Sequence, residues 1–247
     1  MAEKPKDGKG VPVPAKGGVA VAAKGAGAAV EQFLHKVAVA PRRGGTGRGR
    51  LIFAMDATAS REPTWDQACH IQGEMFTATD ALGGLEVQLV FYRGFGECKA
   101  SPWMASSADL VRRMTAVSCL GGHTQIGRVL KHAVTETNRK KVDALVFVGD
   151  AMEEEVDELS HGAGELGLLG VPAFIFHEGY DPVAARGFRQ IAKLTKGAYC
   201  AFDAGSAEQL KALLSAVAVF AAGGRPALED LSREKGGVVK LLTSDLA

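Results

Sequence analysis

Short apolar runs alternate with helical periods from residue 51 to residue 222 of this 247-residue chain. Each run is almost continuously apolar, as expected for a strand in a sheet that is covered on both faces. Alternation of such strands with helices favours a parallel α/β sheet. The predicted strands are 51–56, 86–92, 143–149, 171–177 and 198–203, and the predicted helices are 63–82, 107–117, 125–140, 154–168, 183–194 and 206–222.

One further strand is expected at an edge of this sheet. The segment Glu97 to Met104 follows the strand 86–92 directly after the turn Gly94-Phe95-Gly96, a pattern typical of a hairpin. We therefore predict a Rossmann-like open α/β sheet, mostly parallel with one antiparallel edge strand and with helices on both faces. In open sheets of this kind, ligands bind beyond the carboxyl ends of the strands.

Charge is divided unevenly along the chain. Residues 1–50 contain ten Lys and Arg against three Asp and Glu, a net charge of +7, and residues 51–247 contain 19 against 25, a net charge of −6. We expect a disordered basic tail over residues 1–49, because residues 1–28 contain no aromatic side chain and cannot bury much surface. Apolar residues at helical spacing predict a short helix over 28–40 within it.

The sequence also predicts the bounds of the folded domain, the state of the cysteines and the location of the protein. The predicted folded domain covers residues 50–224, and residues 225–247 form a C-terminal extension. The four cysteines are far apart without a Cys-x-x-Cys pair, which favours neither a zinc site nor a disulfide framework. The apolar stretch that ends at Ala23 is cut by Lys24, and the run Ala212 to Ala222 is too short to span a bilayer. We expect a cytoplasmic protein without membrane contact.

Oxygen-bearing side chains gather at the ends of two predicted strands and in one loop. Asp56, Thr58 and Ser60 follow the first strand, Thr124 lies in a Gly-rich loop that opens a helix, and Asp150 ends the strand 143–149. Carboxylate and hydroxyl oxygens are the ligands that Mg²⁺ and Mn²⁺ prefer. Helix capping and ordinary loop hydroxyls explain any one of these residues. Five residues at matching ends favour a metal site.

The order Asp-x-Thr-x-Ser, then Thr, then Asp resembles the metal-ion-dependent adhesion site of the von Willebrand factor A (VWA) family. The resemblance covers about residues 50–222, in motif order and in strand and helix order. It implies that the hydroxyls of Thr58, Ser60 and Thr124 ligate Mg²⁺ or Mn²⁺, that the carboxylates of Asp56 and Asp150 bind directly or through water, and that one position stays open for an acidic side chain of a partner. The family usually has Ser at the position of Thr58, whose extra methyl group stiffens χ1.

The resemblance also implies a function. The family serves mainly in binding, so the expected role is a metal-dependent protein–protein interaction module and not an enzyme. Stand-alone bacterial cytoplasmic members resemble adaptors in assemblies with ATPases of the AAA class. We therefore expect a protein partner that presents an acidic residue, with an AAA-type ATPase or its complex as one such partner.

Two alternative functions remain, one that uses Asp56 itself and one that uses the Arg/Gly-rich segment before the first strand. A haloacid-dehalogenase-like phosphotransferase also places a nucleophilic Asp after its first strand, as Asp56 is placed, but its second carboxylate would stand where this chain has Thr58. The Arg/Gly-rich segment 42–50 has the composition of segments that bind nucleic acid through phosphates, although it lacks aromatic residues. A Walker A loop, a Gly-x-Ser-x-Gly elbow and a His-Glu-x-x-His pair are all absent from the sequence.

Overall fold

The computed structural model describes residues 18–41, 48–62, 78–79, 84–203 and 207–235. Within these residues, six strands form one open sheet in the order β3-β2-β1-β4-β5-β6. β3 pairs antiparallel with β2, and the other neighbours are parallel, as the sequence predicts. The strands are β1 (Gly49–Asp56), β2 (Leu85–Arg93), β3 (Glu97–Ala100), β4 (Ala144–Gly149), β5 (Ala173–Glu178) and β6 (Ala198–Phe202).

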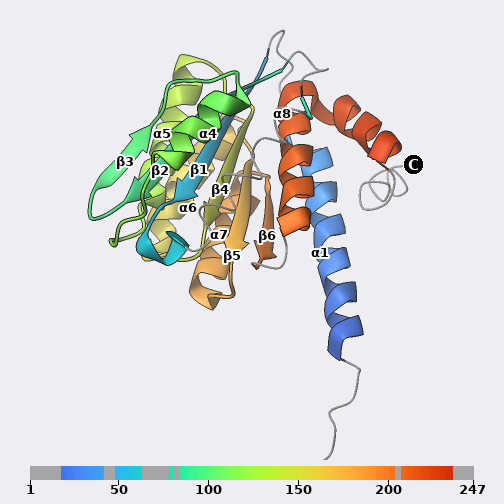
Figure 1. The fold of residues 1–247 in the computed structure, drawn as a ribbon, viewed down its shortest axis with the longest axis horizontal. Helices are drawn as coiled ribbons and strands as arrows, with labels where there is room; N and C mark the ends of the chain where they lie inside the picture. Colours follow the sequence, from blue (N-terminus) through green and yellow to red (C-terminus); the bar gives the residue numbers. More distant parts are fainter. Residues whose placement is uncertain (1–17, 42–47, 63–77, 80–83, 204–206, 236–247) are drawn as a thin grey trace, which may run out of the picture.

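Helices cover both faces of this sheet (Figure 1). α1 (Gly18–Val39), α4 (Ser107–Thr115) and α8 (Ala207–Lys235) share a buried apolar cluster on one face. α5 (Ile126–Arg139), α6 (Val156–Leu168) and α7 (Pro182–Leu194) share the cluster on the other face. The expected architecture of an open sheet between two helical layers is therefore confirmed.

β1 shows why this sequence forms the centre of the sheet. All eight of its residues are buried. Leu51, Phe53 and Met55 belong to the cluster with α1, α4 and α8, whereas Ile52 and Ala54 face α5, α6 and α7. Because successive side chains of a strand point to opposite faces, a continuous apolar run is what a doubly covered strand requires.

The predicted helix 63–82 lies almost wholly outside the described residues. A 3₁₀ turn, η1 (Ala59–Arg61), follows the loop after β1, and Glu62 is helical. The prediction of a helix over 63–82 therefore stays a prediction.

The expected boundary of the disordered tail is wrong. α1 already begins at Gly18, so residues 18–28 are helical and the predicted helix 28–40 is only its second half. Phe33 is 1% exposed, and its ring lies 5.2 Å from that of Phe176 and 6.1 Å from that of Phe174. An Ala-rich sequence favours helix once such an apolar face can anchor it. α1 is thus part of the folded unit.

Arg50 does not belong to a basic linker. It lies in β1, is 5% exposed, and pairs with Glu86 and Glu136 at 3.4 and 3.8 Å. Its guanidinium also lies 3.7 Å from the ring centroid of Trp103. Burying an arginine requires such partners. The segment 42–50 therefore has one arginine fewer available for nucleic acid than the sequence suggests.

α8 crosses the expected domain boundary after residue 224. Gly224 has φ 69° inside this helix and kinks it, and Pro226 follows. The segment Leu210–Leu231 is 22 residues long with a mean hydropathy of 1.2, so by length and composition it could cross a membrane. The shorter run Ala212 to Ala222 could not do so alone. A core helix can have the same length and composition, and 72% of this segment's window is buried inside the fold.

Candidate metal centre

Asp56 is the buried end of β1. Its side chain is fully buried, and Oδ1 accepts a hydrogen bond from the backbone N–H of Thr58 at 2.7 Å. The hydroxyl of Tyr92, at the end of β2, donates to Oδ2 at 3.0 Å. These two donors fix the orientation of the carboxylate at the carboxyl edge of the sheet.

Burial raises the pKa of Asp56, and the nearby charge of Asp150 raises it further, although the hydrogen bonds from Thr58 and Tyr92 act in the opposite direction. Desolvation disfavours the charged form of a carboxylate, and a like charge adds to that effect. A cation between the two aspartates would reverse both contributions. The electrostatics of this carboxylate pair therefore favour a bound positive charge.

The hydroxyls of Thr58 and Ser60 lie next to each other, with their oxygens 3.1 Å apart. Thr58 is 7% exposed and Ser60 is exposed. Thr58 has an extended backbone (φ −71°, ψ 165°) ahead of the 3₁₀ turn, and its hydroxyl makes no cap hydrogen bond to that turn. Both oxygens therefore keep acceptor capacity for another ligand.

Thr124 is held by the segment that follows Asp150. Its Oγ1 accepts from the backbone N–H of Glu153 at 2.9 Å, and its hydroxyl donates to the carboxylate of Glu154. Glu154 also accepts from the backbone N–H of Ile126, so this carboxylate caps the start of α5. One lone pair of Thr124 Oγ1 remains, because a hydroxyl oxygen has two.

Asp150, directly after β4, has an unsatisfied oxygen. Its Oδ1 is buried and accepts no hydrogen bond from any described residue. Buried polar atoms are almost always hydrogen-bonded, so such an atom indicates a missing ligand or strain. The backbone carbonyl of Asp150 accepts from Nε2 of buried His177 at 3.2 Å. Burial lowers the pKa of His177, and its Nδ1 lies 2.8 Å from the hydroxyl oxygen of Tyr199.

Arg61 is a buried cation beside these carboxylates. It is 1% exposed and pairs with Glu178, at the end of β5. Burial lowers the pKa of its guanidinium, and the charges of Asp150 and Asp56 oppose this shift. Asp56, Asp150 and Glu178 together with Arg61 leave a net charge of −2 when all four are ionised, as a count of their charges shows. One divalent cation would neutralise this group.

Backbone contacts hold the two loops against each other. The N–H of Leu120 donates to the carbonyl of Ala57 at 3.0 Å, and the N–H of His123 donates to the carbonyl of Gly94 at 3.1 Å. A Cβ atom at Gly122 would lie 2.1 Å from the Gly94 carbonyl oxygen, so only glycine allows this approach. The loop that carries Thr124 is thereby fixed to the ends of β1 and β2.

Some of the predicted site residues hydrogen-bond to each other directly, and others are connected through hydrogen bonds to a third residue. Asp56, Thr58 and Ser60 share one loop and contact one another, and Asp150 interacts electrostatically with Asp56. Thr124 is linked to the segment after Asp150 through Glu153 and Glu154. Among the described residues, no group of three or more His, Cys, Asp or Glu side chains is arranged to hold a metal. A site here therefore depends on hydroxyl oxygens.

A comparison with protein-family models gives no match, and neither does a comparison with curated proteins. Solved structures do match. A von Willebrand factor type A protein from Catenulispora acidiphila superposes with a TM-score of 0.56 at 17% identity, over 70% of this chain and 43% of that one. The SpRpn10 VWA domain superposes with a TM-score of 0.54 at 11% identity, over 72% of this chain and 97% of that domain. This chain has the VWA fold.

A third matching structure is of a protein with a metal in its MIDAS motif. The proximal thread matrix protein 1 of the mussel byssus, described with a zinc-occupied MIDAS motif, superposes with a TM-score of 0.54 at 18% identity, over 70% of this chain and 45% of that one. The chain spans less than half the length of the first three structures that it matches. The superpositions show a shared VWA fold.

Three residues beside the candidate site are not among the ligands that the sequence predicts. Tyr92 orients Asp56, Arg61 supplies a buried positive charge, and Glu154 holds Thr124. Glu154 has a weak sequence signal, since it stands four residues after Asp150 in a run of three glutamates. Arg61 and Tyr92 have none, because their importance depends on burial beside carboxylates from other elements.

Proposed function

We propose that this VWA fold is a metal-dependent protein-binding module. Asp56, Thr58, Ser60, Thr124 and Asp150 would hold Mg²⁺ or Mn²⁺, and an acidic side chain of a partner protein would complete the site. The buried Oδ1 of Asp150, which has no hydrogen-bond donor among the described residues, is the observation that carries the proposal. A bound cation would supply charge stabilisation to a carboxylate oxygen that the fold has removed from water.

The oxygen donors favour a hard cation. Two carboxylates and three hydroxyls suit Mg²⁺ or Mn²⁺ better than softer metals, which prefer imidazole and thiolate ligands. Zinc in the MIDAS motif of the mussel protein is a property of that protein and supports a divalent ion here only by analogy. Arg61 adds a positive charge nearby, which would reduce the affinity for a cation and help to attract an acidic partner.

Exposed apolar side chains surround the same edge of the sheet. Phe95 in the β2–β3 turn is 82% exposed, Leu120 is 52% exposed, and Tyr180 after β5 is 78% exposed. The ring of Phe95 lies 5.1 Å from that of His123, next to Thr124. Exposed aromatic residues around a charged centre are the usual anchors of protein interfaces. They support a protein partner over a small substrate.

The partner class and setting are part of the proposal. We propose a cytoplasmic adaptor whose partner presents an Asp or Glu, with an AAA-type ATPase or its complex as the first candidate. We further propose that the module is not an enzyme. The loop offers no second carboxylate two residues after Asp56, because Thr58 stands there, and a helix follows at Glu62. Proton transfer would lack its usual donor at this position.

Calorimetric titration tests the metal site without a partner. Wild type is expected to bind Mg²⁺ or Mn²⁺ in a one-to-one ratio, and Asp150→Asn is expected to lose this binding while it remains folded by circular dichroism. Asp157→Asn, an exposed carboxylate on α6, is the matched control and should bind as wild type does. Equal binding by wild type and Asp150→Asn would contradict the proposal.

Affinity capture from the native cell extract tests the partner. Wild type is expected to retain a protein in Mg²⁺ that EDTA releases, whereas Asp150→Asn should not retain it. A partner that stays bound in EDTA would contradict a metal bridge. Hydrolysis of phosphate esters in Mg²⁺ that disappears in Asp56→Asn would favour the phosphotransferase alternative.

A further inference from the structure

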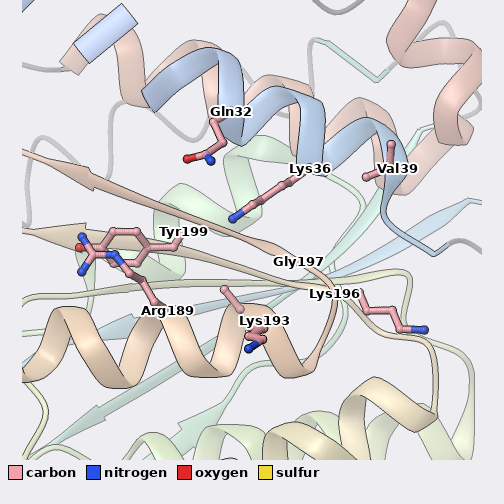
Figure 2. A pocket seen from close by; sticks show the side chains of 9 residues that line it. Gln32, Lys36, Val39, Arg189, Lys193, Lys196, Gly197 and Tyr199 are labelled. Atoms are coloured by element: carbon pink, nitrogen blue, oxygen red, sulfur yellow. The ribbon is translucent and has the colours of Figure 1, made fainter. Parts of the chain in front are cut away.

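A second concave region lies on the flank of the sheet away from the candidate metal centre. It is a groove of about 620 Å³ between α1, α7 and the amino end of β6. Figure 2 shows Gln32 and Lys36 extending from α1 toward Arg189 and Tyr199. The other lining residues come from the end of α7, the turn after it and the last turn of α1: Ala192, Lys193, Lys196, Gly197 and Val39.

The charge of this groove has one sign. Lys36, Arg189, Lys193 and Lys196 line it, all four are exposed, and none of the described residues that line it carries a carboxylate. Lys36 and Lys193 lie in the last turns of α1 and α7, where the helix dipole favours a cation. Arg189 lies before the last turn of α7, and Lys196 lies beyond its end. The dipoles therefore explain only half of the cluster.

Lys196 occupies an unfavourable backbone conformation. Its φ is 57°, and it is the only residue other than glycine with a positive φ in the described part of the chain. The N–H of Lys196 donates to the carbonyl of Lys193 at 3.2 Å, and that of Gly197 donates to the carbonyl of Ala192 at 2.8 Å, so this turn closes α7. Glycine is the usual residue at such a position. Strained backbone at a charged groove indicates a side chain that is kept for function.

Arg189 and Tyr199 form a flat platform in the groove. The Arg189 guanidinium lies 4.5 Å from the centroid of the Tyr199 ring. An arginine held over an aromatic face keeps the N–H donors at the edge of its guanidinium free to bind the oxygens of a phosphate. Lysine ammonium groups add point charges around it. The Gln32 amide is a further neutral donor on the opposite wall.

We propose that this groove binds a small anion with two or more linked phosphate groups. Its volume falls in the range of small-molecule sites, which are concave and a few hundred cubic ångströms in size. Four cations within one groove match the charge of a diphosphate or triphosphate better than that of a single carboxylate. The inference is independent of the proposed metal centre, since the two sets of residues do not overlap.

Titration with pyrophosphate in EDTA tests the site while metal is absent. Wild type is expected to bind pyrophosphate and a nucleoside triphosphate more tightly than inorganic phosphate, and high salt should weaken each. Lys36→Met and Arg189→Met are expected to bind pyrophosphate about tenfold more weakly, the effect of losing one hydrogen bond to a charged group. Lys131→Met, an exposed lysine on α5, is the control and should bind as wild type does.

Lys196→Gly separates function from folding. It removes one charge from the groove and relieves the positive φ, so it should weaken pyrophosphate binding while it raises the melting temperature. Three results would overturn the proposal: no binding of any of the three probes by wild type, the same loss in Lys131→Met as in Lys36→Met, or saturable binding of a 20-nucleotide RNA with none of pyrophosphate.

Discussion

At the scale of single residues, the charge of the Asp56 carboxylate is unfavourable in the folded protein when no cation is bound. Its carboxylate is buried and lies near Asp150. Burial raises its pKa most, and the charge of Asp150 raises it further. A group whose pKa is raised in the folded state destabilises that state when pH rises through the folded value. The metal-free protein therefore loses stability as pH rises through the folded pKa of Asp56, which is expected of a residue kept for binding and not for stability.

Asp56→Asn should therefore stabilise the metal-free protein. The amide is neutral, its oxygen can still accept from the N–H of Thr58, and its NH₂ can donate to the Tyr92 hydroxyl. In EDTA we expect a higher melting temperature than that of wild type, and in Mg²⁺ we expect no further rise. Scanning calorimetry in both buffers measures this. A lower melting temperature in EDTA would show that the Asp56 charge is compensated within the chain.

Thr58 tests whether hydroxyls hold the cation. Its side chain is buried, and its Oγ1 lies 3.1 Å from Oγ of Ser60. Thr58→Val keeps the shape and removes the oxygen, so it should weaken Mn²⁺ binding about tenfold or more, whereas Thr58→Ser keeps the oxygen and should stay within a few-fold of wild type. Calorimetric titration of both variants decides this, and equal weakening would assign the effect to packing.

At the scale of elements, the apolar runs were sufficient to locate the strands. Each predicted strand overlaps an observed one. A strand covered on both faces appears in the sequence as a short, continuous apolar run, which is easy to locate. The length of α1 was not predictable in the same way. Its first half is rich in Ala and Gly and gains a fixed position only through Phe33, Leu34 and Val37, which are packed into the core.

α1 should therefore contribute strongly to stability. Phe33→Ala removes a ring that is 1% exposed and contacts Phe174 and Phe176, and truncations of this kind cost about 3 to 5 kcal/mol. Gln32→Ala, an exposed neighbour on the same helix, is the control and should change stability by less than about 0.5 kcal/mol. Urea unfolding of both variants measures the difference. A small effect of Phe33→Ala would mean that α1 is not docked on the sheet.

The sequence predicts candidate ligands of the site but not the residues that surround them. Asp56, Ser60 and Asp150 could be named from their places after strands, since parallel strands end at one edge. Arg61 and Tyr92 could not, because each acts on a carboxylate that packing brings beside it, and Glu154 has only the weak signal of its acidic run. A charge becomes a determinant of a site only when tertiary packing removes water around it, and no local pattern records that.

At the scale of the whole molecule, metal binding should stabilise the fold. A ligand that binds only the folded state raises the unfolding free energy by about 2.7 kcal/mol at one hundred times its dissociation constant. We expect Mg²⁺ to raise the melting temperature of wild type in a concentration-dependent way, and EDTA to reverse this. Asp150→Asn should show no rise. A rise of equal size in Asp150→Asn would place the stabilising ion elsewhere.

His177 joins the two flanks of the molecule. Its Nε2 donates to the backbone carbonyl of Asp150 on one side, and its Nδ1 is hydrogen-bonded to the hydroxyl of Tyr199, which lines the basic groove, on the other. A ligand that moves Tyr199 can therefore act on Asp150 through His177. The binding equilibria of cation and anion then form a closed thermodynamic cycle, so the factor by which pyrophosphate changes the Mg²⁺ affinity must equal the factor by which Mg²⁺ changes the pyrophosphate affinity.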